Sequence, residues 1–298
     1  MVFDDDDVRD RLDAATTVRV MRSALVAHHD GALRAPPRVR ADLGAGDLVF
    51  TAGCLPAQGL FGFRAYDTFA GAEQLVAVWD AADGTLRALV HGAELGARRT
   101  GAIGALAVDA AAGPGPVRVG LVGTGTQAWA QLWAVRAVRP LEAVTVAARD
   151  LRRAEEFARR ATAELGVAVR AVARVEDAVR EHEVVIVATS SAVPVLEADW
   201  IAPGTHVTTV GPKTVSRHEL PASLVDRAEV VLTDSLAQAG GYAEAHLFPT
   251  DRMVELGAVL ARAATGRTGP DQITVFCSVG LAGTEVALAA ALCEAPVR

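Results

Sequence analysis

The chain has 298 residues, a formal net charge of −7, 51% hydrophobic residues and 22% charged residues. This length suits one large or two medium domains with a buried core, and the composition is that of a globular protein. The negative charge argues against nucleic acid or an anionic membrane as partner, and no apolar run reaches the roughly 18 residues of a membrane span. An acidic start, Asp4 to Asp7, is unlike a signal peptide, so we expect a cytoplasmic protein. The widely spaced Cys54, Cys277 and Cys293 form no metal-binding pair, and no metal site is expected.

The first part of the chain predicts helices followed by a sheet. Asp4 to Asp7 and Thr16-Thr17 precede apolar residues at helical spacing, which predicts two capped amphipathic helices. Alternating segments then predict a mostly antiparallel sheet over residues 47–51, 60–66, 74–79 and 86–90, with Asp83-Gly84 as a hairpin turn. Small and apolar residues over 92–112 predict a buried helix. Two glycines and two prolines over 113–116 predict a domain boundary.

A glycine turn follows the next apolar stretch. Residues 117–122 predict a strand, Gly123, Gly125 and Ala128 form G-x-G-x-x-A, and residues 129–135 have helical spacing. In a dinucleotide-binding unit the first glycine allows the tight turn, the second lets a pyrophosphate approach the backbone, and the small third residue lets the helix pack on the strand. Thr124, Thr126 and Gln127 complete this loop. An ordinary strand-to-helix turn is the alternative, and the context favours a nucleotide site.

The remaining chain alternates between apolar strands and helices. Strands are predicted over 143–148, 167–172, 183–188, 205–210, 230–233 and 273–277, and helices over 151–165, 175–180, 251–263 and 280–293. This alternation predicts an α/β fold with a Rossmann-type, doubly wound parallel sheet. We assign the nucleotide-binding domain to residues 115–278. Residues 1–114 then form a separate, smaller α+β domain, to which the final segment is free to return.

The end of the second strand of this fold bears on the choice of cofactor. An acidic residue there accepts hydrogen bonds from the NAD ribose, whereas small residues beside an arginine accommodate the NADP phosphate. Here the small residues 146–148 are followed by Arg149 and then Asp150. We therefore prefer NADP(H), and Asp150 keeps NAD(H) possible. A solvated helix start is the alternative interpretation of these charges.

Several stretches in chain order resemble the ornithine cyclodeaminase/mu-crystallin family. The matching motifs lie at 36–39 (Pro-Pro-Arg-Val), 62–64 (Gly-Phe-Arg), 95–102 with its Arg-Arg-Thr, 119–127, 188–196 with 200–204, 209–220, and 274–282 (Thr-Val-Phe-Cys-Ser-Val-Gly-Leu-Ala). The resemblance implies a Rossmann domain joined to a substrate-binding domain built from both chain ends, residues 1–114 with 279–298, and homodimers formed through the latter. It implies hydride chemistry at carbon bearing nitrogen, on a small amino acid or cyclic imine.

The resemblance also carries site residues. It implies that Arg38 and Arg99 bind the substrate carboxylate, a role that suits the forked guanidinium group. The alternative is that both are salt-bridge or helix-end arginines. It further implies that the cofactor contacts residues beyond the glycine loop, namely Ala188, Thr189, Ser190, Gly211, Ser278 and Gly280.

Two positions depart from the family pattern. Arg64 stands where the family has a lysine, and a guanidinium group is a poor proton shuttle near neutral pH. Lys213, the only lysine of the chain, stands where cyclodeaminases have an acid. We therefore treat Arg64 as a substrate-binding or catalytic candidate and Lys213 as a candidate acid/base. Phosphate binding, helix capping or no role at all are the alternatives for Lys213.

Three functions remain open from the sequence. The first is an NAD(P)-dependent imine (ketimine) reductase or amino-acid dehydrogenase acting on a small carboxylate-bearing substrate. The second is an ornithine-type cyclodeaminase that retains NAD, which the departures at Arg64 and Lys213 weaken. The third is a nucleotide-dependent small-ligand-binding protein without turnover.

Overall fold

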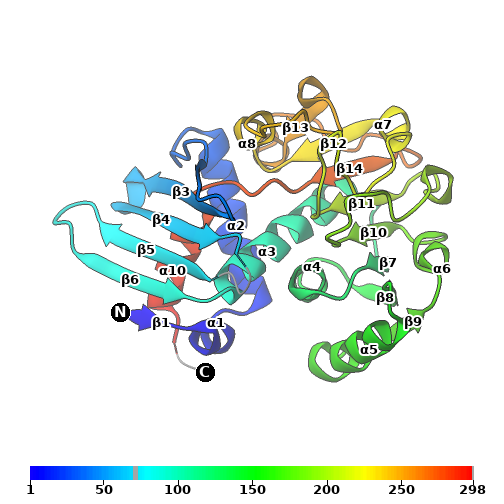
Figure 1. Cartoon of the computed structure of the whole chain (residues 1–298), viewed down its shortest axis with the longest axis horizontal. Helices are drawn as coiled ribbons and strands as arrows, with labels where there is room; N and C mark the ends of the chain where they lie inside the picture. Colours follow the sequence, from blue (N-terminus) through cyan, green and yellow to red (C-terminus); the bar gives the residue numbers. More distant parts are fainter. Residues whose placement is uncertain (70–72, 297–298) are drawn as a thin grey trace. The chain divides into compact units, whose positions relative to one another are not determined.

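The computed structural model describes residues 1–69 and 73–296, and the chain forms two compact units (Figure 1). Unit 1 comprises Met1–Arg99 and Gly280–Arg298, and unit 2 comprises Thr100–Val279. The sequence places the first boundary near residue 114, whereas unit 2 already begins inside α3 (Glu94–Ala111). Glycines at 101 and 104 explain this difference, because a Cβ at either would overlap the following helix α4 (Thr126–Val135).

Unit 1 contains a six-stranded sheet in the order β1-β6-β5-β4-β3-β2, antiparallel apart from the β1–β6 pair. This confirms the predicted antiparallel sheet. Helices α2 and α10 pack on each other, and α10 packs on the sheet. The elements are β1 (Val2–Phe3), α1 (Asp5–Arg11), α2 (Ala14–His29), β2 (Val39–Asp42), β3 (Asp47–Leu55), the 3-10 helix η1 (Pro56–Gln58), β4 (Leu60–Asp67), β5 (Gln74–Asp80), β6 (Leu86–His91) and α10 (Thr284–Glu294).

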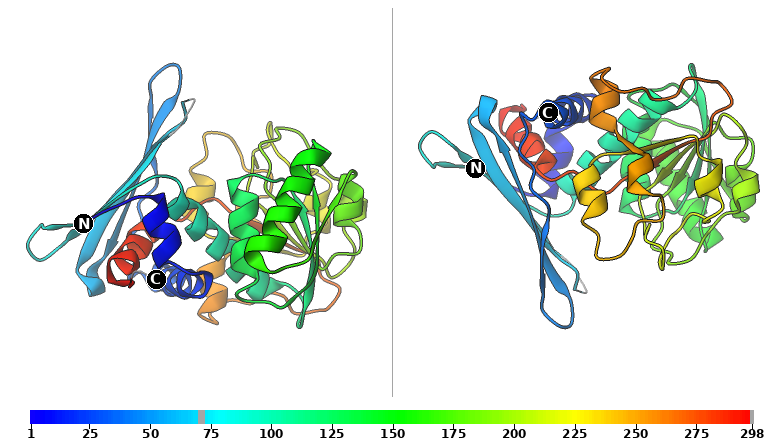
Figure 2. Two further views of the ribbon diagram at one scale, coloured as in Figure 1. Left: turned by 90° about the horizontal axis from the view of Figure 1, so that it is seen from below. Right: turned by 90° about the horizontal axis from the view of Figure 1, so that it is seen from above.

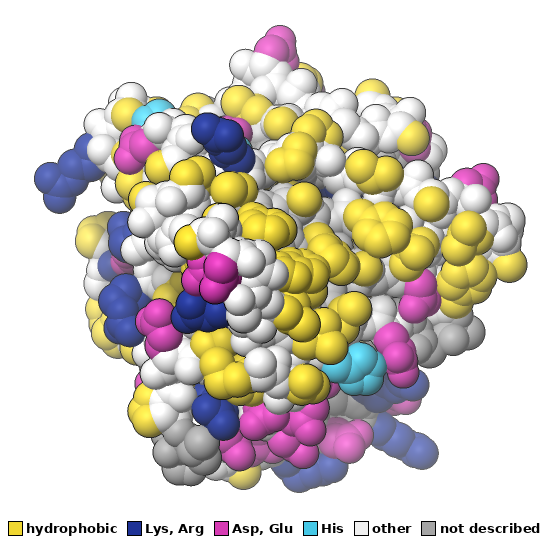
Figure 3. Space-filling view, turned by 90° about the vertical axis from the view of Figure 1, so that its left-hand side faces the viewer, with side chains coloured by type: hydrophobic (Ala, Val, Ile, Leu, Met, Phe, Trp, Pro, Cys, Tyr) yellow, Lys and Arg dark blue, Asp and Glu magenta, His cyan; other side chains and the backbone are white. Residues whose placement is uncertain are grey.

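The two faces of this sheet carry different side chains. Facing α10, residues such as Val49 and Val78 are buried. On the opposite face Phe61 lies across from Trp79, and the two rings stack with centroids 5.8 Å apart. Phe61 and Phe50 on this face are 40% and 38% exposed, and Figure 3 shows apolar side chains gathered there. The sheet therefore has an apolar face that α10 does not cover.

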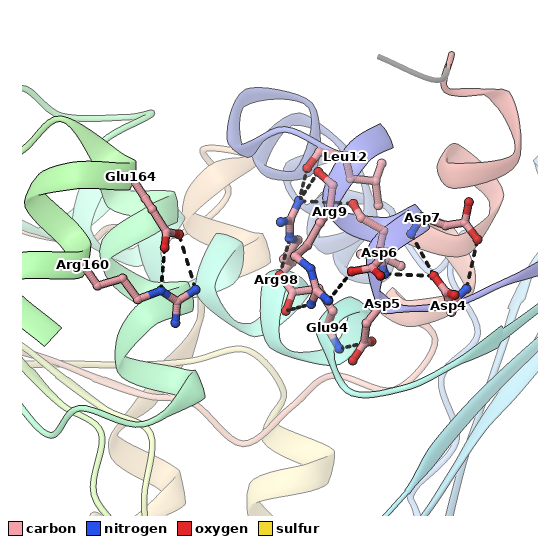
Figure 4. Close-up of polar contacts among 11 residues, drawn as sticks. Asp4, Asp5, Asp6, Asp7, Arg9, Leu12, Glu94, Arg98, Arg160 and Glu164 are labelled. Atoms are coloured by element: carbon pink, nitrogen blue, oxygen red, sulfur yellow. Dashed lines mark hydrogen bonds and ion pairs between the residues drawn. The ribbon is translucent and has the colours of Figure 1, made fainter. Parts of the chain in front are cut away.

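The predicted acidic cap at the N-terminus is present. Asp4 accepts the N–H of Asp7 at 3.0 Å and donates its own N–H to the Asp7 carboxylate at 3.2 Å, which forms a capping box for α1 (Figure 4). Arg98 at the start of α3 donates to the carbonyl of Leu12, the C-cap of α1. Arg98 therefore links two helices of unit 1.

Unit 2 contains an eight-stranded parallel sheet in the order β13-β12-β14-β11-β10-β7-β8-β9. The strand order reverses between β7 and β10, which is where doubly wound sheets bind ligands beyond their carboxyl ends. The elements are β7 (Val117–Val122), α4, β8 (Leu141–Ala147), α5 (Leu151–Leu165), β9 (Val169–Val172), α6 (Val175–Val179), β10 (Val184–Val187), η2 (Ala198–Trp200), β11 (His206–Thr209), α7 (Leu224–Arg227), β12 (Val230–Thr233), α8 (Leu236–Gly240), η3 (Thr250–Arg252), β13 (Met253–Glu255), α9 (Leu256–Leu260) and β14 (Thr274–Cys277).

Helices cover both faces of this sheet (Figure 2). Helices α4 and α5 meet through Trp129 and Phe157, whose ring centroids lie 5.8 Å apart. On the other face α6 comes so close to β7 that a Cβ at Gly120 would overlap the carbonyl of Ala178. Strands β10 and β11 are buried throughout. The predicted doubly wound parallel sheet is thus confirmed.

Two local predictions are wrong. The helix expected over 251–263 is instead η3, the edge strand β13 and the short α9, because Met253–Glu255 pairs in parallel with β12. The sequence predicts Thr16-Thr17 as the N-terminal cap of α2. The helix instead begins one turn earlier, where the side chain of Asp13 accepts the N–H of Thr16 at 2.6 Å. No helix within residues 1–69 and 73–296 is long and apolar enough to cross a membrane.

Candidate functional site

The glycine turn joins β7 to α4 at the point where the strand order reverses. Gly123 has a φ of +115°, and a Cβ there would lie 2.4 Å from the carbonyl oxygen of Ala188, which follows β10. A Cβ at Gly125 would meet nothing within 4 Å, so this residue faces open space. Gly125 is also the N-cap of α4, and no side chain caps that helix. The first N–H groups of α4 are therefore available for an anion such as a pyrophosphate.

The remaining loop residues surround this turn. Thr126 begins α4, and the buried amide oxygen of Gln127 has no hydrogen-bond partner among the described residues. Arg149 is exposed just beyond β8, two residues after its last position. Asp150 caps α5, since its side chain accepts the N–H of Arg152 at 3.0 Å. Asp150 is the acidic residue that leaves NAD(H) open as the cofactor, and it is already engaged in this local hydrogen bond.

A buried carboxylate joins the turns that follow β10 and β11. Glu219 accepts hydrogen bonds from the N–H and hydroxyl groups of Thr189, at 2.9 and 2.8 Å, and from the hydroxyl group of Thr209 at 2.6 Å. It also accepts the N–H groups of Val210 at 3.1 Å and Gly211 at 2.6 Å. Its charge is therefore spread over five donors. The expected cofactor positions Thr189 and Gly211 are held together through Glu219, whereas Ser190 is exposed.

Lys213 is 4% exposed and points into the protein. Its ammonium group donates to the carbonyl of Val210 at 3.1 Å and to that of Gly211. Its backbone carbonyl accepts the N–H of Leu247 at 2.7 Å. Lys213 thus lies at the carboxyl edge of the sheet, with its charge directed at the turn after β11.

A cluster of arginines lies in unit 1. Arg99 and Arg64 both contact Oε1 of Glu285, with Arg99 Nη2 at 2.6 Å and Arg64 Nη1 at 3.0 Å. Arg64 also donates from Nη2 to Gln74 Oε1 at 2.6 Å. Arg38 Nη2 donates to the carbonyl of Gly280 at 3.4 Å. The predicted substrate residues Arg38, Arg64 and Arg99 are all in unit 1.

Gly280 connects these arginines. Its φ is +84°, and a Cβ there would lie 3.2 Å from Arg99 Nη2 and 3.6 Å from Arg38 Nη2. The structure therefore places Gly280 beside the arginines of unit 1, whereas Ser278 stays in unit 2 with its N–H on the carbonyl of Thr209 at 3.1 Å. Gly280 was expected among the cofactor residues, and its neighbours are the expected substrate residues.

Glu285 is buried at 1% exposure. Burial raises the pKa of its carboxyl group, but Arg99 and Arg64 outweigh this effect and hold the pKa below its ordinary value. Burial also lowers the pKa of the Arg64 guanidinium, an effect that Glu285 opposes. One carboxylate therefore faces two buried guanidinium groups.

Among the described residues, most of the buried side-chain donors without a hydrogen-bond partner in this cluster belong to Arg99. Its side chain is 7% exposed, and its buried Nε and Nη1 have no hydrogen-bond partner within the described part of the chain. For Arg64 the same holds only of Nε. Because buried donors without acceptors are costly, these atoms indicate a place for an anionic ligand.

Glu285 and Gln74 were missed by the sequence interpretation. Glu285 lies 221 residues from Arg64 along the chain, and Gln74 lies 10 residues from it on the neighbouring strand. The only signal for Glu285 was an acidic residue within the apolar segment 280–293.

The family model of the ornithine cyclodeaminase/mu-crystallin family matches residues 1–296. The chain belongs to this family. It is 29% identical over 232 residues to a Delta(1)-pyrroline-2-carboxylate reductase of Bacillus cereus, covering 75% of this chain and 71% of the relative. The structure is similar to the iminosuccinate reductase of Paracoccus denitrificans in complex with NAD+, with a TM-score of 0.85 and 25% identity over 98% of this chain and 95% of that one.

An archaeal alanine dehydrogenase dimer with bound NAD shares the fold, with a TM-score of 0.88 and 24% identity over 99% of this chain and 95% of that one. The chain spans about three fifths of the length of several curated relatives that it matches, at 60% to 62%. Their activities are therefore a basis for proposals about this protein.

Proposed function

We propose that the protein is an NAD(P)-dependent oxidoreductase that acts on the C–N bond of a small carboxylate-bearing substrate, as an imine (ketimine) reductase or amino-acid dehydrogenase. The observation that carries this proposal is the pair of unpartnered donors on buried Arg99, in a chain that also has a nucleotide-type glycine turn. The names of family relatives, among them reductases of cyclic and open-chain imines, support the same reaction class.

The chain's own residues fit a nucleotide cofactor. Gly123 and Gly125 leave room for a pyrophosphate, and the uncapped start of α4 supplies N–H donors. When bound, the nicotinamide nucleotide supplies or accepts the hydride. We propose NADP(H) as the preferred form, because Arg149 is exposed beyond β8 while Asp150 is engaged as a helix cap. NAD(H) is the form named for two structural relatives.

The arginine cluster would hold the substrate carboxylate. Arg99 offers Nε and Nη1 as donors, and Glu285 contacts its Nη2, so the guanidinium group is already oriented before a ligand binds. Arg38 and Arg64 add positive charge to the same cluster. Because both Nη atoms of Arg64 are hydrogen-bonded to Glu285 and Gln74, we propose that Arg64 supports the carboxylate site and does not transfer protons.

A substrate panel tests this proposal. Cyclic imines, 2-oxo acid/amine pairs and diamino acids are incubated with NADPH or NADH, and nucleotide oxidation is compared with product formed. Equal amounts of both support the reductase. Product without net nucleotide oxidation from a diamino acid would instead identify a cyclodeaminase, and nucleotide binding without any turnover would identify a binding protein.

We also propose that the protein is a homodimer that buries the apolar face of the unit 1 sheet. Phe50, Phe61 and Trp79 lie on this face, and α10 covers the other one. Exposed apolar patches of this kind mark interaction surfaces. The archaeal relative is named as a dimer, which supports a dimeric state.

A further inference from the structure

We infer that Lys213 and Glu219 form a charge clamp on the turn Val210-Gly211, and that Lys213 is a positioning residue for the nucleotide-binding edge of unit 2. The inference rests on the proposed function only in naming a nucleotide as the ligand of that edge. It assigns Lys213 a different role from the acid/base role that its place in the sequence suggested.

The two charges act on neighbouring peptide groups and meet on the one that joins Val210 to Gly211. Glu219 accepts the N–H groups of Val210 and Gly211, at 3.1 and 2.6 Å. Lys213 donates to the carbonyl oxygens of the same two residues, at 3.1 Å for Val210. Each charge meets the end of the peptide dipole that it attracts, and such charge-assisted hydrogen bonds are stronger than neutral ones. Together they hold the peptide plane between Val210 and Gly211 at both its N–H end and its carbonyl end.

Both charged groups are shielded from water. Glu219 is 0% exposed and Lys213 is 4% exposed. Electrostatic interactions at such positions are screened less than at the surface. A clamp made of these two side chains therefore holds the turn more firmly than exposed side chains would.

The clamp extends to the neighbouring strand. Glu219 also binds the N–H and hydroxyl groups of Thr189, directly beyond β10. A Cβ at Gly211 would lie 2.1 Å from the carbonyl oxygen of Thr189, so only glycine allows this approach. The turns beyond β10 and β11 are thus held as one body, next to the glycine turn that follows β7.

These contacts oppose a proton-shuttle role for Lys213. Its ammonium group serves two backbone carbonyls, and loss of its proton would weaken both hydrogen bonds. The N–H of Gly211 is likewise engaged by Glu219. Gly211 therefore contributes the shape of the edge to nucleotide binding, and its N–H is not available as a donor to the nucleotide.

The test uses the full chain with Lys213→Met, and Arg217→Met as the control in the exposed part of the same loop. One readout is hydrogen exchange of the Val210 and Gly211 amides without nucleotide, and the other is the Kd for NADPH and NADH from nucleotide fluorescence. We expect Lys213→Met to speed exchange at Gly211, whose N–H shares a peptide group with the Val210 carbonyl, and to weaken nucleotide binding, each by about tenfold, the lower range for losing a charged hydrogen-bond partner. The Val210 amide should change less, because it also donates to the carbonyl of Val187 at 3.0 Å. The control should change neither exchange nor nucleotide binding.

Unchanged exchange at the Gly211 amide would overturn the clamp, and faster exchange there with an unchanged Kd would overturn its role in positioning the nucleotide. Loss of turnover with both readouts unchanged would restore Lys213 as the acid/base. If Lys213→Met does not fold, Glu219→Gln tests the same turn through the acceptor of the Val210 and Gly211 N–H groups. Unchanged exchange at Gly211 in that variant would also overturn the clamp. If the wild-type chain binds no nucleotide, the proposed function fails, while amide exchange still tests the clamp.

Discussion

Replacing Glu285 by glutamine removes the charge that bridges Arg64 and Arg99. The side chains of Glu285, Arg64 and Arg99 are 2%, 13% and 7% exposed, so solvent cannot compensate for the loss. Breaking a buried ion pair costs about 3–5 kcal/mol, and the amide oxygen of glutamine keeps one hydrogen bond. We therefore expect Glu285→Gln to lower the free energy of unfolding of unit 1 by about 3 kcal/mol.

Urea unfolding of Glu285→Gln, Arg64→Met and the double variant measures this coupling. If the carboxylate compensates the Arg64 charge, the double variant is less destabilised than the sum of the single ones, by about 1–3 kcal/mol. The pKa of Glu285 is lowered in the folded protein, so the stabilisation is present above its unfolded pKa and is lost as the pH falls through the folded one. Additive effects, or a Glu285→Gln variant as stable as the wild type, would refute the reasoning.

Four further predictions concern separate parts of the chain. Arg99→Lys should raise KM for the carboxylate substrate by about tenfold or more and leave the nucleotide Kd unchanged, because a compact ammonium group replaces the planar guanidinium group. An unchanged KM would contradict this role of Arg99. Burial lowers the pKa of His206 to about 3, so between pH 4 and 6 only the unfolded state binds a proton at this residue. The free energy of unfolding therefore falls as the pH falls, and His206→Gln should flatten this pH dependence by about 1.4 kcal/mol per pH unit in urea unfolding. Phe61→Asp should convert the dimer to a monomer in light scattering, whereas Val193→Asp, at an exposed position of unit 2, should leave the dimer unchanged. Arg149→Ser should raise the Kd for NADPH about tenfold and leave that for NADH within about twofold, and equal changes for both nucleotides would remove the NADP(H) preference.

Much of unit 2 could be predicted from local patterns. Helix α5 begins and ends at the predicted residues because Asp150 caps it and Gly166, at a φ of 65°, closes it. The buried strands are equally visible as apolar runs. The helix expected over 251–263 failed because an edge strand of three residues is decided by its partner β12, which no local pattern shows.

The candidate site was predicted unevenly for the same physical reason. The glycine turn is contiguous in sequence, so its spacing alone identified it. Glu285 acts on Arg64 and Arg99, which come from β4 and α3, and only the folded unit 1 brings them together. Lys213 was identified as a candidate because it is the only lysine of the chain. Whether its charge faces a ligand or the backbone depends on the fold of the 210–219 loop.

The central claim is that buried Arg99 binds the carboxylate of a substrate whose C–N bond exchanges hydride with a nicotinamide nucleotide. The direct measurement compares kcat/KM for NADPH- or NADH-dependent reduction of a cyclic imine with and without its carboxylate. Two charge-assisted hydrogen bonds at about 1.5 kcal/mol each predict a preference of about 100-fold or more for the carboxylate form. Equal rates for the two imines would contradict the account, as would nucleotide binding without oxidation of NADPH or NADH by any carboxylate imine.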